Sequence, residues 1–445
     1  MDRLFGTDGI RSVAGQFPLD YSSVFKLGKG LIDLLRDQGL APSVLIGKDS
    51  RESGSWLNDA LFQGIKDASG EAVSLGIIPT PAVSHLTNKH AFSAGIVISA
   101  SHNPYQDNGI KIFSPQGTKI SENWEIQLEE AIRSSQNSNT QEVAEATPDR
   151  RLVNEYKDFL KSQFANIRIQ KPYKIVLDCA NGASSFFAPE IFSDLGFKVF
   201  PINASPNGKN INKNCGSLYP DDLAKTVKDI GANIGVAYDG DADRALCVDE
   251  KGTILNGDHT LYICAKFLKD LGRLKSDTVV ATTMSNIGLE TALQKMNIKL
   301  VRTQVGDKHV RNKMVELNAN LGGEQSGHTI FLDDCLSGDG ILTSLKICKV
   351  MVTKNIPLSK LVSGYKESPQ ILLNIKVAKK EDFSHFPEIL NTMGRIKESL
   401  GHEGRLDLRF SGTESLARIM IEGKDENQIR TEAENMAAVI SKYLG

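Results

Sequence analysis

The 445-residue chain is predicted to be an α/β protein, with three similar α/β domains built on mixed or parallel sheets and a small C-terminal α+β domain. Three observations support this prediction. Short apolar strands alternate with helical segments, an order typical of βαβ units. This alternation starts three times along the chain. From residue 370 the order changes to strand, helix, two strands and a final helix.

The first domain, residues 1–150, opens with the clearest helix. Apolar residues recur at helical spacing over residues 21–38, and Gly39 can adopt the left-handed conformation that ends a helix. The elements expected next are a strand at residues 43–47, a helix at 56–68 and a strand at 94–98. A polar tract at residues 134–147 has too little apolar content to pack, so we expect it to loop out before the second domain.

The second and third domains, residues 151–252 and 253–366, repeat the alternation of strands and helices. In the second we expect strands at residues 174–177, 198–202 and 233–238 and helices at 189–195 and 220–230. In the third we expect helices at residues 260–271, 289–295 and 309–317 and strands at 278–282 and 299–303. The last domain, residues 367–445, follows a linker at 365–369 and ends in an amphipathic helix at 429–444. Its strands are expected from residue 370 and at 406–410 and 417–421.

Composition and charge argue against several classes of partner. Lys and Arg number 52 and Asp and Glu number 54, and the net charge of −2 provides no general field for nucleic acid or an anionic membrane surface. The N-terminus lacks a signal or transit pattern, and no segment carries about 18 consecutive apolar residues, so we expect a cytoplasmic protein without a membrane partner. The six scattered cysteines show no CxxC spacing and are expected to be reduced and buried.

The segment ISASHNP at residues 98–104 directly follows the apolar strand expected at 94–98. Ser101 and His102 therefore stand at the end of a buried strand, where Pro104 prevents a helix from forming. A serine hydroxyl in this position points into a cleft and can carry a phosphoryl group. The alternative is a serine that only caps or turns the chain.

Three carboxylates, Asp239, Asp241 and Asp243, follow another apolar strand at alternate positions. They share one face of an extended segment, and small residues between them let the chain curl around an ion. Two carboxylates about 4 Å apart repel by about 4 kcal/mol at an effective dielectric near 20, so a converged arrangement needs a cation. We expect one Mg²⁺ ion per active site. A solvated acidic turn is the alternative, while a calcium loop is disfavoured because its terminal Glu and helical frame are missing.

Two further segments combine glycines with polar side chains. GGEQSGH at residues 322–328 presents Glu324 and Ser326 together, a pair suited to sugar hydroxyls, and the alternative is a simple glycine turn. RFSGTES at residues 409–415 offers hydroxyls, exposed backbone N–H groups and guanidinium groups, which together form an anion cradle. The residues of this cradle are Arg409, Ser411, Gly412, Thr413 and, beyond them, Arg418.

These four segments resemble the motifs of the α-D-phosphohexomutases, in the family's order and with one motif in each expected domain. The resemblance spans essentially the whole chain. It implies a four-domain, heart-shaped enzyme with a central cleft, a phosphoserine at the position of Ser101 and Mg²⁺ held by the three aspartates and by the phosphoserine. It also implies that the segment at 322–328 binds the sugar and that the loop at 409–413 binds the non-reacting phosphate. The family's RPSGTEP loop has prolines where this chain has Phe410 and Ser415.

The resemblance also indicates the residues around the phosphoserine. Arg11 and Lys111 match family positions that contact the transferring phosphate, and His102 is adjacent to the nucleophile. We therefore expect these three side chains to handle protons and charge during the reaction. The residues expected to support them are Lys48, Arg51 and Arg244.

The segments at 98–104 and 322–328, with NKNCGS at 212–217 and VGDKHV at 305–310, are most similar to the bacterial branch of the family that acts on glucosamine phosphates. The implied reaction interconverts glucosamine 6-phosphate and glucosamine 1-phosphate through a phosphoserine enzyme and a 1,6-bisphosphate, on the route to UDP-N-acetylglucosamine. Phosphorylation of Ser101 would activate the enzyme, and sugar phosphates would be its partners. The alternatives are a phosphomannomutase/phosphoglucomutase and a non-catalytic sugar-phosphate sensor. The oligomeric state is not predicted, and a homodimer is one possibility. Motion of the last domain is expected to help the bisphosphate turn.

Overall fold

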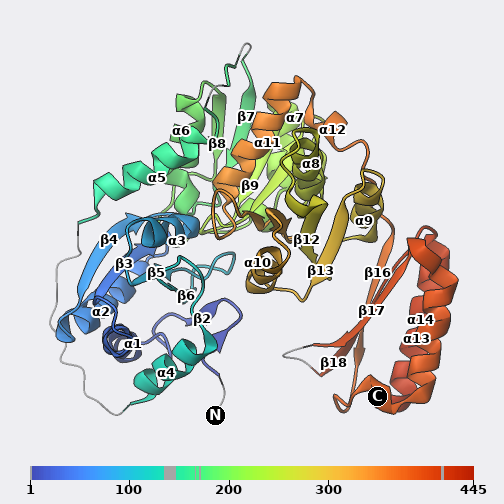
Figure 1. Cartoon of the computed structure of the whole chain (residues 1–445), viewed down its shortest axis with the longest axis horizontal. Coiled ribbons are helices and arrows are strands. Elements are labelled where there is room, and N and C mark those ends of the chain that lie inside the picture. Colours follow the sequence, from blue (N-terminus) through green and yellow to red (C-terminus); the bar gives the residue numbers. More distant parts are fainter. Residues whose placement is uncertain (1–2, 135–146, 166, 170–171, 412–414) are drawn as a thin grey trace.

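The computed structural model describes residues 3–134, 147–165, 167–169, 172–411 and 415–445. These residues form four sheets that follow one another along the chain (Figure 1). The first three sheets mix parallel and antiparallel pairing, whereas the fourth is antiparallel throughout. The predicted fold class, three α/β units and a C-terminal α+β unit, is therefore confirmed.

The first sheet has the order β1-β2-β6-β5-β3-β4. Its strands are β1 (Phe5–Gly6), β2 (Gly9–Val13), β3 (Ser43–Lys48), β4 (Glu71–Ile77), β5 (Ala94–Ile98) and β6 (Asp107–Phe113). Its helices are α1 (Tyr21–Asp37), α2 (Gly54–Asp67), α3 (Thr80–Lys89) and α4 (Glu122–Arg133). β3 pairs in parallel with β4 and β5, and β6 runs antiparallel to both β5 and β2. The reversal from β5 to β6 creates the loop that contains Ser101.

The second sheet has the order β11-β10-β9-β7-β8. Its strands are β7 (Lys174–Asp178), β8 (Lys198–Ile202), β9 (Ile234–Tyr238), β10 (Ala245–Asp249) and β11 (Ile254–Leu255). The helices of this part are α5 (Arg150–Ser162), α6 (Ala188–Asp194) and α7 (Asp221–Ile230). β7 pairs in parallel with β8 and β9, and β10 then turns back antiparallel to β9. The three aspartates lie in this second reversal, between β9 and β10.

The third sheet has the order β13-β12-β14-β15. Its strands are β12 (Thr278–Thr282), β13 (Lys299–Thr303), β14 (Leu321–Gly323) and β15 (Thr329–Phe331). Its helices are α8 (Gly257–Asp270), α9 (Ile287–Gln294), α10 (Asp307–Glu316), α11 (Gly340–Lys354) and α12 (Leu358–Leu361). β12 pairs in parallel with β13 and β14, and β15 returns antiparallel to β14. The segment expected to bind the sugar forms the turn of this β14–β15 hairpin.

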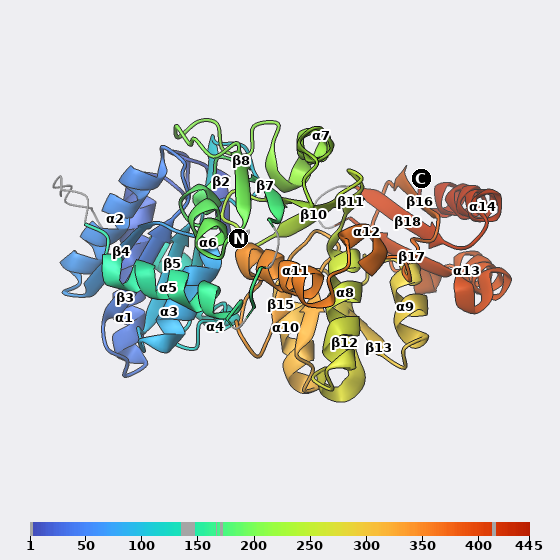
Figure 2. The same cartoon turned by 90° about the horizontal axis from the view of Figure 1, so that it is seen from above.

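The fourth sheet has the order β16-β18-β17 and is covered by two helices. Its elements are β16 (Gln370–Lys376), α13 (Pro387–Leu400), β17 (Arg405–Phe410), β18 (Leu416–Glu422) and α14 (Glu426–Leu444). In both views the first and fourth sheets lie at opposite ends of the molecule, and α13 and α14 cover the outer face of the fourth sheet (Figures 1 and 2). The predicted C-terminal helix and three strands are therefore present.

Local sequence explains where several helices begin and end. Asp20 caps α1 by accepting a hydrogen bond of 3.0 Å from the backbone N–H of Ser23. Gly39 and Gly231 follow α1 and α7 with φ angles of 70° and 62°, the left-handed conformation that suits glycine. The predicted left-handed stop at Gly39 is confirmed.

Packing ties the first three sheets into one body. One continuous cluster of buried apolar residues includes Val97, Leu177 and Ala281, one from each sheet, and separate clusters fill other faces of these sheets. The fourth sheet has a separate core with α13 and α14. All six cysteines are buried and free of disulfides, as expected. Among the described residues, no helix is both long and apolar enough to span a membrane.

Candidate active site

Ser101 lies in the loop between β5 and β6 and is almost fully buried. Its backbone adopts a left-handed conformation, with a φ angle of 52°, which is uncommon for a residue with a Cβ atom. Its Oγ donates a hydrogen bond of 2.6 Å to Oδ2 of Asp239 and lies 3.3 Å from Nδ1 of His102. The structure thus brings the predicted nucleophile, one predicted metal ligand and the predicted proton handler together.

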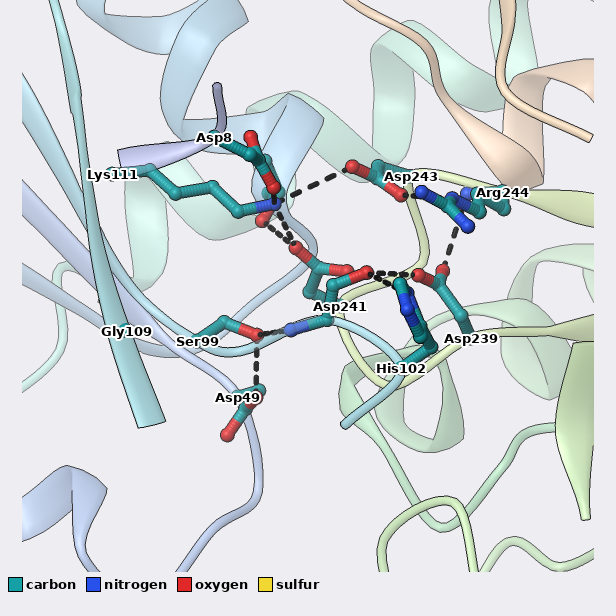
Figure 3. A network of polar contacts seen from close by, with 12 residues as sticks. Asp8, Asp49, Ser99, His102, Gly109, Lys111, Asp239, Asp241, Asp243 and Arg244 are labelled. Carbon is teal, nitrogen blue, oxygen red and sulfur yellow. Dashed lines mark hydrogen bonds and ion pairs between the residues drawn. The ribbon is translucent and has the colours of Figure 1, made fainter. Parts of the chain in front are cut away.

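Arg51 fixes the loop that contains Ser101 through hydrogen bonds to its backbone. Its guanidinium is fully buried and pairs with Oδ2 of Asp49 at 2.9 Å. Ser99 extends the network, since its Oγ donates to the same carboxylate (2.5 Å) and accepts from the backbone N–H of Ser101 (2.9 Å) (Figure 3). The remaining acceptors of Arg51 are the carbonyl oxygens of Ser101, Asn103, Pro104 and Asp107. Arg51 is therefore a buried clamp on the serine loop.

Lys48 and Asn212 each donate side-chain hydrogen bonds. Lys48, the last residue of β3, is buried and donates to Oγ of Ser55 at 3.0 Å. Asn212 donates through Nδ2 to the carbonyl oxygens of Ser101 (2.8 Å) and Asn103 (3.0 Å). Asn212 was not singled out as a site residue, although it begins the NKNCGS segment.

The three aspartates converge as predicted. Asp239, Asp241 and Asp243 are buried, and one oxygen of each lies within 4.8 Å of the others. Burial and the two neighbouring carboxylates raise the pKa of Asp239 well above its ordinary value. Oδ1 of Asp241 and Oδ1 of Asp243 are buried and accept no hydrogen bond from the part of the chain that the structure describes. A divalent cation would supply these missing partners and relieve the repulsion, so this donor set fits a metal ion.

Lys111 of β6 provides positive charge at the same place. Its Nζ lies 2.9 Å from Oδ2 of Asp241, 3.5 Å from Oδ2 of Asp243 and 3.0 Å from Oδ2 of Asp8 (Figure 3). Burial alone would lower the pKa of Lys111, but these carboxylates raise it well above its ordinary value. Lys111 is therefore protonated at neutral pH. Asp8 was missed by the sequence analysis, although it stands three residues before Arg11 in the same segment.

Two arginines face the cleft with unused donors. Arg11 of β2 donates to Asp8 and, at 3.5 Å, to Oδ1 of Asn103. Arg244 follows the aspartates and donates through its backbone N–H to Oδ1 of Asp239 (3.2 Å). Among the described residues, no acceptor lies within hydrogen-bond distance of the buried Nε atom of either arginine, and Nε of Arg244 lies 3.8 Å from Oδ1 of Asp243. Unpaired buried guanidinium donors point to an anionic ligand.

His102 is half-buried next to these arginines. Burial lowers the pKa of its imidazole, and the positive charges of Arg244 and Arg11 lower it further. The ring is therefore neutral at pH 7 and free to accept a proton.

The turn between β14 and β15 presents the predicted sugar-binding pair. Oε1 of Glu324 accepts a hydrogen bond of 3.0 Å from the backbone N–H of Gly306, and Oγ of Ser326 lies 3.5 Å from Oε2 of Glu324. Gly327 has a φ angle of 95°, and a Cβ atom there would lie 2.6 Å from the carbonyl oxygen of Ala245. Only glycine permits this close approach of the turn to β10.

His328 links this turn to the aspartates. It is buried, and its Nδ1 lies 3.6 Å from Oδ2 of Asp243. Its Nε2 accepts a hydrogen bond of 3.1 Å from the backbone N–H of Gly338. His328 is the last residue of the GGEQSGH segment and was not predicted as a site residue.

The predicted phosphate cradle lies in the fourth domain. Arg409 and Arg418 pair directly across β17 and β18, and Nη2 of Arg418 donates to Oγ of Ser411 at 3.4 Å. Gly412 and Thr413 lie outside the described residues. The described part of the cradle is therefore two guanidinium groups and one hydroxyl at the end of one hairpin.

A cavity of ≈ 430 Å³ joins the first three domains. Side chains from the serine loop, the aspartate turn and the sugar turn line it, and none of the described residues of the fourth domain does. Its polar lining consists of Arg3, Thr7, Asp8, Arg11, His102, Asp243, Arg244, Asp307, Glu324 and His328. The cavity thus gathers three of the four predicted motifs around one space.

Curated relatives resemble the chain over its whole length. The chain is 42% identical to the phosphoglucosamine mutase of Koribacter versatilis, over 100% of this chain and 97% of that protein. It is 45% identical to the phosphoglucosamine mutase of Caldicellulosiruptor saccharolyticus, over 100% of both chains.

Solved structures show the same fold. A phosphoglucomutase/phosphomannomutase family protein from Burkholderia thailandensis has a TM-score of 0.80 at 21% identity and covers 99% of this chain and 98% of its own. The Aspergillus fumigatus N-acetylphosphoglucosamine mutase in complex with GlcNAc-6P and magnesium has a TM-score of 0.68 at 17% identity and covers 99% of this chain and 95% of its own.

Family descriptions cover nearly the whole chain. The four domains described for phosphoglucomutase/phosphomannomutase match in order: the alpha/beta/alpha domains I, II and III at residues 2–139, 154–252 and 256–368, and the C-terminal domain at 372–439. The chain therefore belongs to the phosphoglucomutase/phosphomannomutase family.

Proposed function

We propose that the protein is a phosphoglucosamine mutase, which interconverts glucosamine 6-phosphate and glucosamine 1-phosphate in the supply of UDP-N-acetylglucosamine. The hydrogen bond of 2.6 Å between Oγ of Ser101 and Oδ2 of Asp239 carries the proposal, because it places a nucleophile beside a donor set that fits a metal. The glucosamine substrate is supported by full-length relatives of that name at 40–45% identity.

The active form carries a phosphoryl group on Ser101 and one Mg²⁺ ion. Asp239, Asp241 and Asp243 would hold the ion, and an oxygen of the phosphoserine would complete its shell. When bound, Mg²⁺ neutralises negative charge on the transferring phosphoryl group. The unpaired Nε donors of Arg11 and Arg244 would bind phosphate oxygens on the cleft side.

In the first half of the reaction, a hydroxyl oxygen of the sugar phosphate attacks the phosphorus on Ser101. The bond between phosphorus and Oγ of Ser101 breaks as the new bond forms. The neutral His102 accepts the proton of the attacking hydroxyl, and the protonated Lys111 supplies a proton to Oγ. The products are a 1,6-bisphosphate and the free serine.

In the second half, the bisphosphate turns and Oγ of Ser101 attacks its other phosphorus while Lys111 takes back the proton of Oγ. The bond between that phosphorus and the sugar oxygen breaks, and His102 returns its proton to this oxygen. Glu324 and Ser326 hold the sugar hydroxyls in both orientations. The cradle in the fourth domain binds the phosphate that does not react, with Arg409, Ser411, Gly412, Thr413 and Arg418. Arg51 supports the serine loop through its hydrogen bond to the carbonyl oxygen of Ser101, and Lys48 at the end of β3 donates to Oγ of Ser55.

Four domains, at residues 1–150, 151–252, 253–366 and 367–445, would surround this cleft, and movement of the last would let the bisphosphate turn. The expectations of a cytoplasmic location, of sugar phosphates but no nucleic acid or membrane as partners, and of a possible homodimer stay predictions.

A mutase assay with Ser101-phosphorylated protein and Mg²⁺ tests the function. We expect turnover of glucosamine 6-phosphate to exceed that of glucose and mannose phosphates, and we expect Ser101→Ala to abolish it. Preference for a neutral hexose phosphate would make the protein a phosphomannomutase/phosphoglucomutase. Binding of sugar phosphates without any turnover would make it a sensor.

A further inference from the structure

Four carboxylates line the cavity, from Asp8, Asp243, Asp307 and Glu324. Two of them are already engaged. Asp8 contacts Nζ of Lys119 with Oδ1 (2.7 Å) and Nζ of Lys111 with Oδ2 (3.0 Å). Asp243 belongs to the proposed metal site. The two carboxylates left to meet a ligand are those of Asp307 and Glu324.

Asp307 is fixed with one oxygen and presents the other. It is the first residue of α10, and its Oδ1 accepts hydrogen bonds from Nζ of Lys119 (2.6 Å) and from the backbone N–H of Lys308 (2.8 Å). Its Oδ2 lies 3.9 Å from Nε2 of His328, which is beyond hydrogen-bond distance. That His328 nitrogen already accepts from the backbone of Gly338. Oδ2 of Asp307 therefore lies within ion-pair distance of His328 but accepts no hydrogen bond from any of the described residues, and Asp307 lines the cavity.

The backbone ties Asp307 to the proposed sugar-binding pair. Gly306, its chain neighbour, donates to Oε1 of Glu324 at 3.0 Å. Glu324 and Ser326 suit vicinal hydroxyls, and an adjacent carboxylate suits a positively charged substituent on the next carbon of the ring. Arg11 and Arg244 line the same cavity, and their positive charges and the Nε donors that no described residue accepts favour an anion. Together these groups match a ligand that carries phosphate, hydroxyl and ammonium groups.

We infer that Oδ2 of Asp307 binds the 2-ammonium group of an amino sugar phosphate and so selects it over a neutral hexose phosphate. This inference rests on the proposed function. The amine is largely protonated near pH 7, and an ammonium–carboxylate hydrogen bond is stronger than one from a neutral hydroxyl. The difference corresponds to about tenfold in selectivity.

The test is Asp307→Asn, which keeps the shape of the side chain and removes its charge. We expect kcat/KM for glucosamine 6-phosphate to fall about tenfold, while kcat/KM for glucose 6-phosphate stays within about twofold of the original enzyme. Asp270→Asn is the matched control, because it removes a surface carboxylate of the same domain that pairs with Lys354 at 3.0 Å. We expect this control to change neither substrate.

Lys119→Met separates recognition from structure. It removes the partner that Asp307 shares with Asp8 and leaves the Asp307 carboxylate in place. We expect it to affect both substrates alike and to keep the preference for the amino sugar. If Asp307→Asn does not fold, Asp307→Ser and Asp307→Glu replace it, with the preference lost in the first and kept in the second.

Equal losses on both substrates in Asp307→Asn would overturn the inference and leave the proposed function intact. A wild-type enzyme that does not prefer glucosamine 6-phosphate would overturn the proposed function itself, before any variant is compared.

Discussion

Arg51 and Asp49 form a fully buried ion pair of 2.9 Å directly beneath the loop that carries Ser101. Neither side chain lines the cavity, yet the pair bonds the loop through Ser99 and through the carbonyl oxygens of Ser101 and Asn103. The left-handed conformation of Ser101 is uncommon for a residue with a Cβ atom, so the surrounding contacts must hold it in place. The orientation of the nucleophile thus depends on a charge pair outside the cavity.

Replacing Arg51 by Lys tests this dependence. An ammonium group cannot reach the same set of acceptors as the planar fork, so Asp49 loses part of its pairing. We expect the free energy of unfolding to fall by about 3 kcal/mol and kcat to fall at least about tenfold, with a smaller change in KM. Urea denaturation and steady-state kinetics measure both. Arg36→Lys, at an exposed ion pair, is the control. A variant as stable and active as the original enzyme would refute the clamp.

Asp241→Asn is expected to weaken metal binding. Oδ1 of Asp241 is buried without a donor, and the triad offers one oxygen from each residue. Loss of this charge should raise the dissociation constant for Mn²⁺, used as a probe for Mg²⁺, by at least about tenfold. Isothermal titration of the purified protein gives the value, and Asp222→Asn on α7 serves as a control. Unchanged Mn²⁺ affinity would mean that the ion binds elsewhere.

His85 makes stability depend on pH. It stacks on Phe159 with ring centroids 4.1 Å apart, and its buried Nε2 has no hydrogen-bond partner among the described residues. Burial, reinforced by Lys89, lowers the pKa of His85 to about 4, while Glu155 acts in the opposite direction. Between about pH 6.5 and pH 4, His85 is therefore protonated in the unfolded chain and neutral in the folded chain.

The free energy of unfolding should therefore fall as the pH drops from about 6.5 to about 4, and the contribution of His85 to this fall is on the order of 3 kcal/mol. Below about pH 4, His85 should contribute no further change. His85→Gln does not titrate, so the gap in the free energy of unfolding between wild type and variant should shrink between pH 7 and pH 4. Urea denaturation at both values measures the gap. A gap that stays constant or widens on acidification would contradict the assignment.

Glu422 anchors the fourth domain to the third. It is fully buried at the end of β18 and accepts hydrogen bonds from Nε of Arg405 and from the backbone N–H of Ile287, both at 3.1 Å. We expect Glu422→Gln to loosen the fourth domain, because the neutral side chain leaves Arg405 without its ionic partner. Cleavage in the linker at residues 365–369 by a low dose of protease should become about tenfold faster. An unchanged rate would show that other contacts hold the domain.

The sequence predicted the site better where one segment contains all the residues that act together. The spacing of Asp239, Asp241 and Asp243 predicted their convergence, because one turn carries all three. Lys111 lies on β6 and Asp8 lies in the turn between β1 and β2, and their contact depends on the antiparallel pairing of β6 with β2. Because β6 was not predicted as a strand, the contact between Lys111 and Asp8 could not be predicted either.

The same reason explains the other omissions. His328 reaches the site from the β14–β15 turn of the third sheet, and Asn212 reaches it from a loop after β8 of the second sheet. The packing of the sheets, which no local pattern encodes, determines which atoms they meet. Periodicity located helices such as α1, α8 and α14, but the helices α4, α5 and α11 and the parallel strand β4 were not predicted. The short strands β1, β11, β14 and β15 offer too few residues to show a period.

A covalently held phosphate at Ser101 is the central claim, and peptide mass mapping tests it most directly. The purified protein is incubated with glucosamine 1,6-bisphosphate and Mg²⁺, digested and compared with Ser101→Ala treated in the same way. The account predicts that one phosphoryl group is added to the peptide containing Ser101 and that glucosamine phosphate removes it again. Phosphate on another residue, or no phosphate in a protein that still turns over glucosamine 6-phosphate, would contradict it.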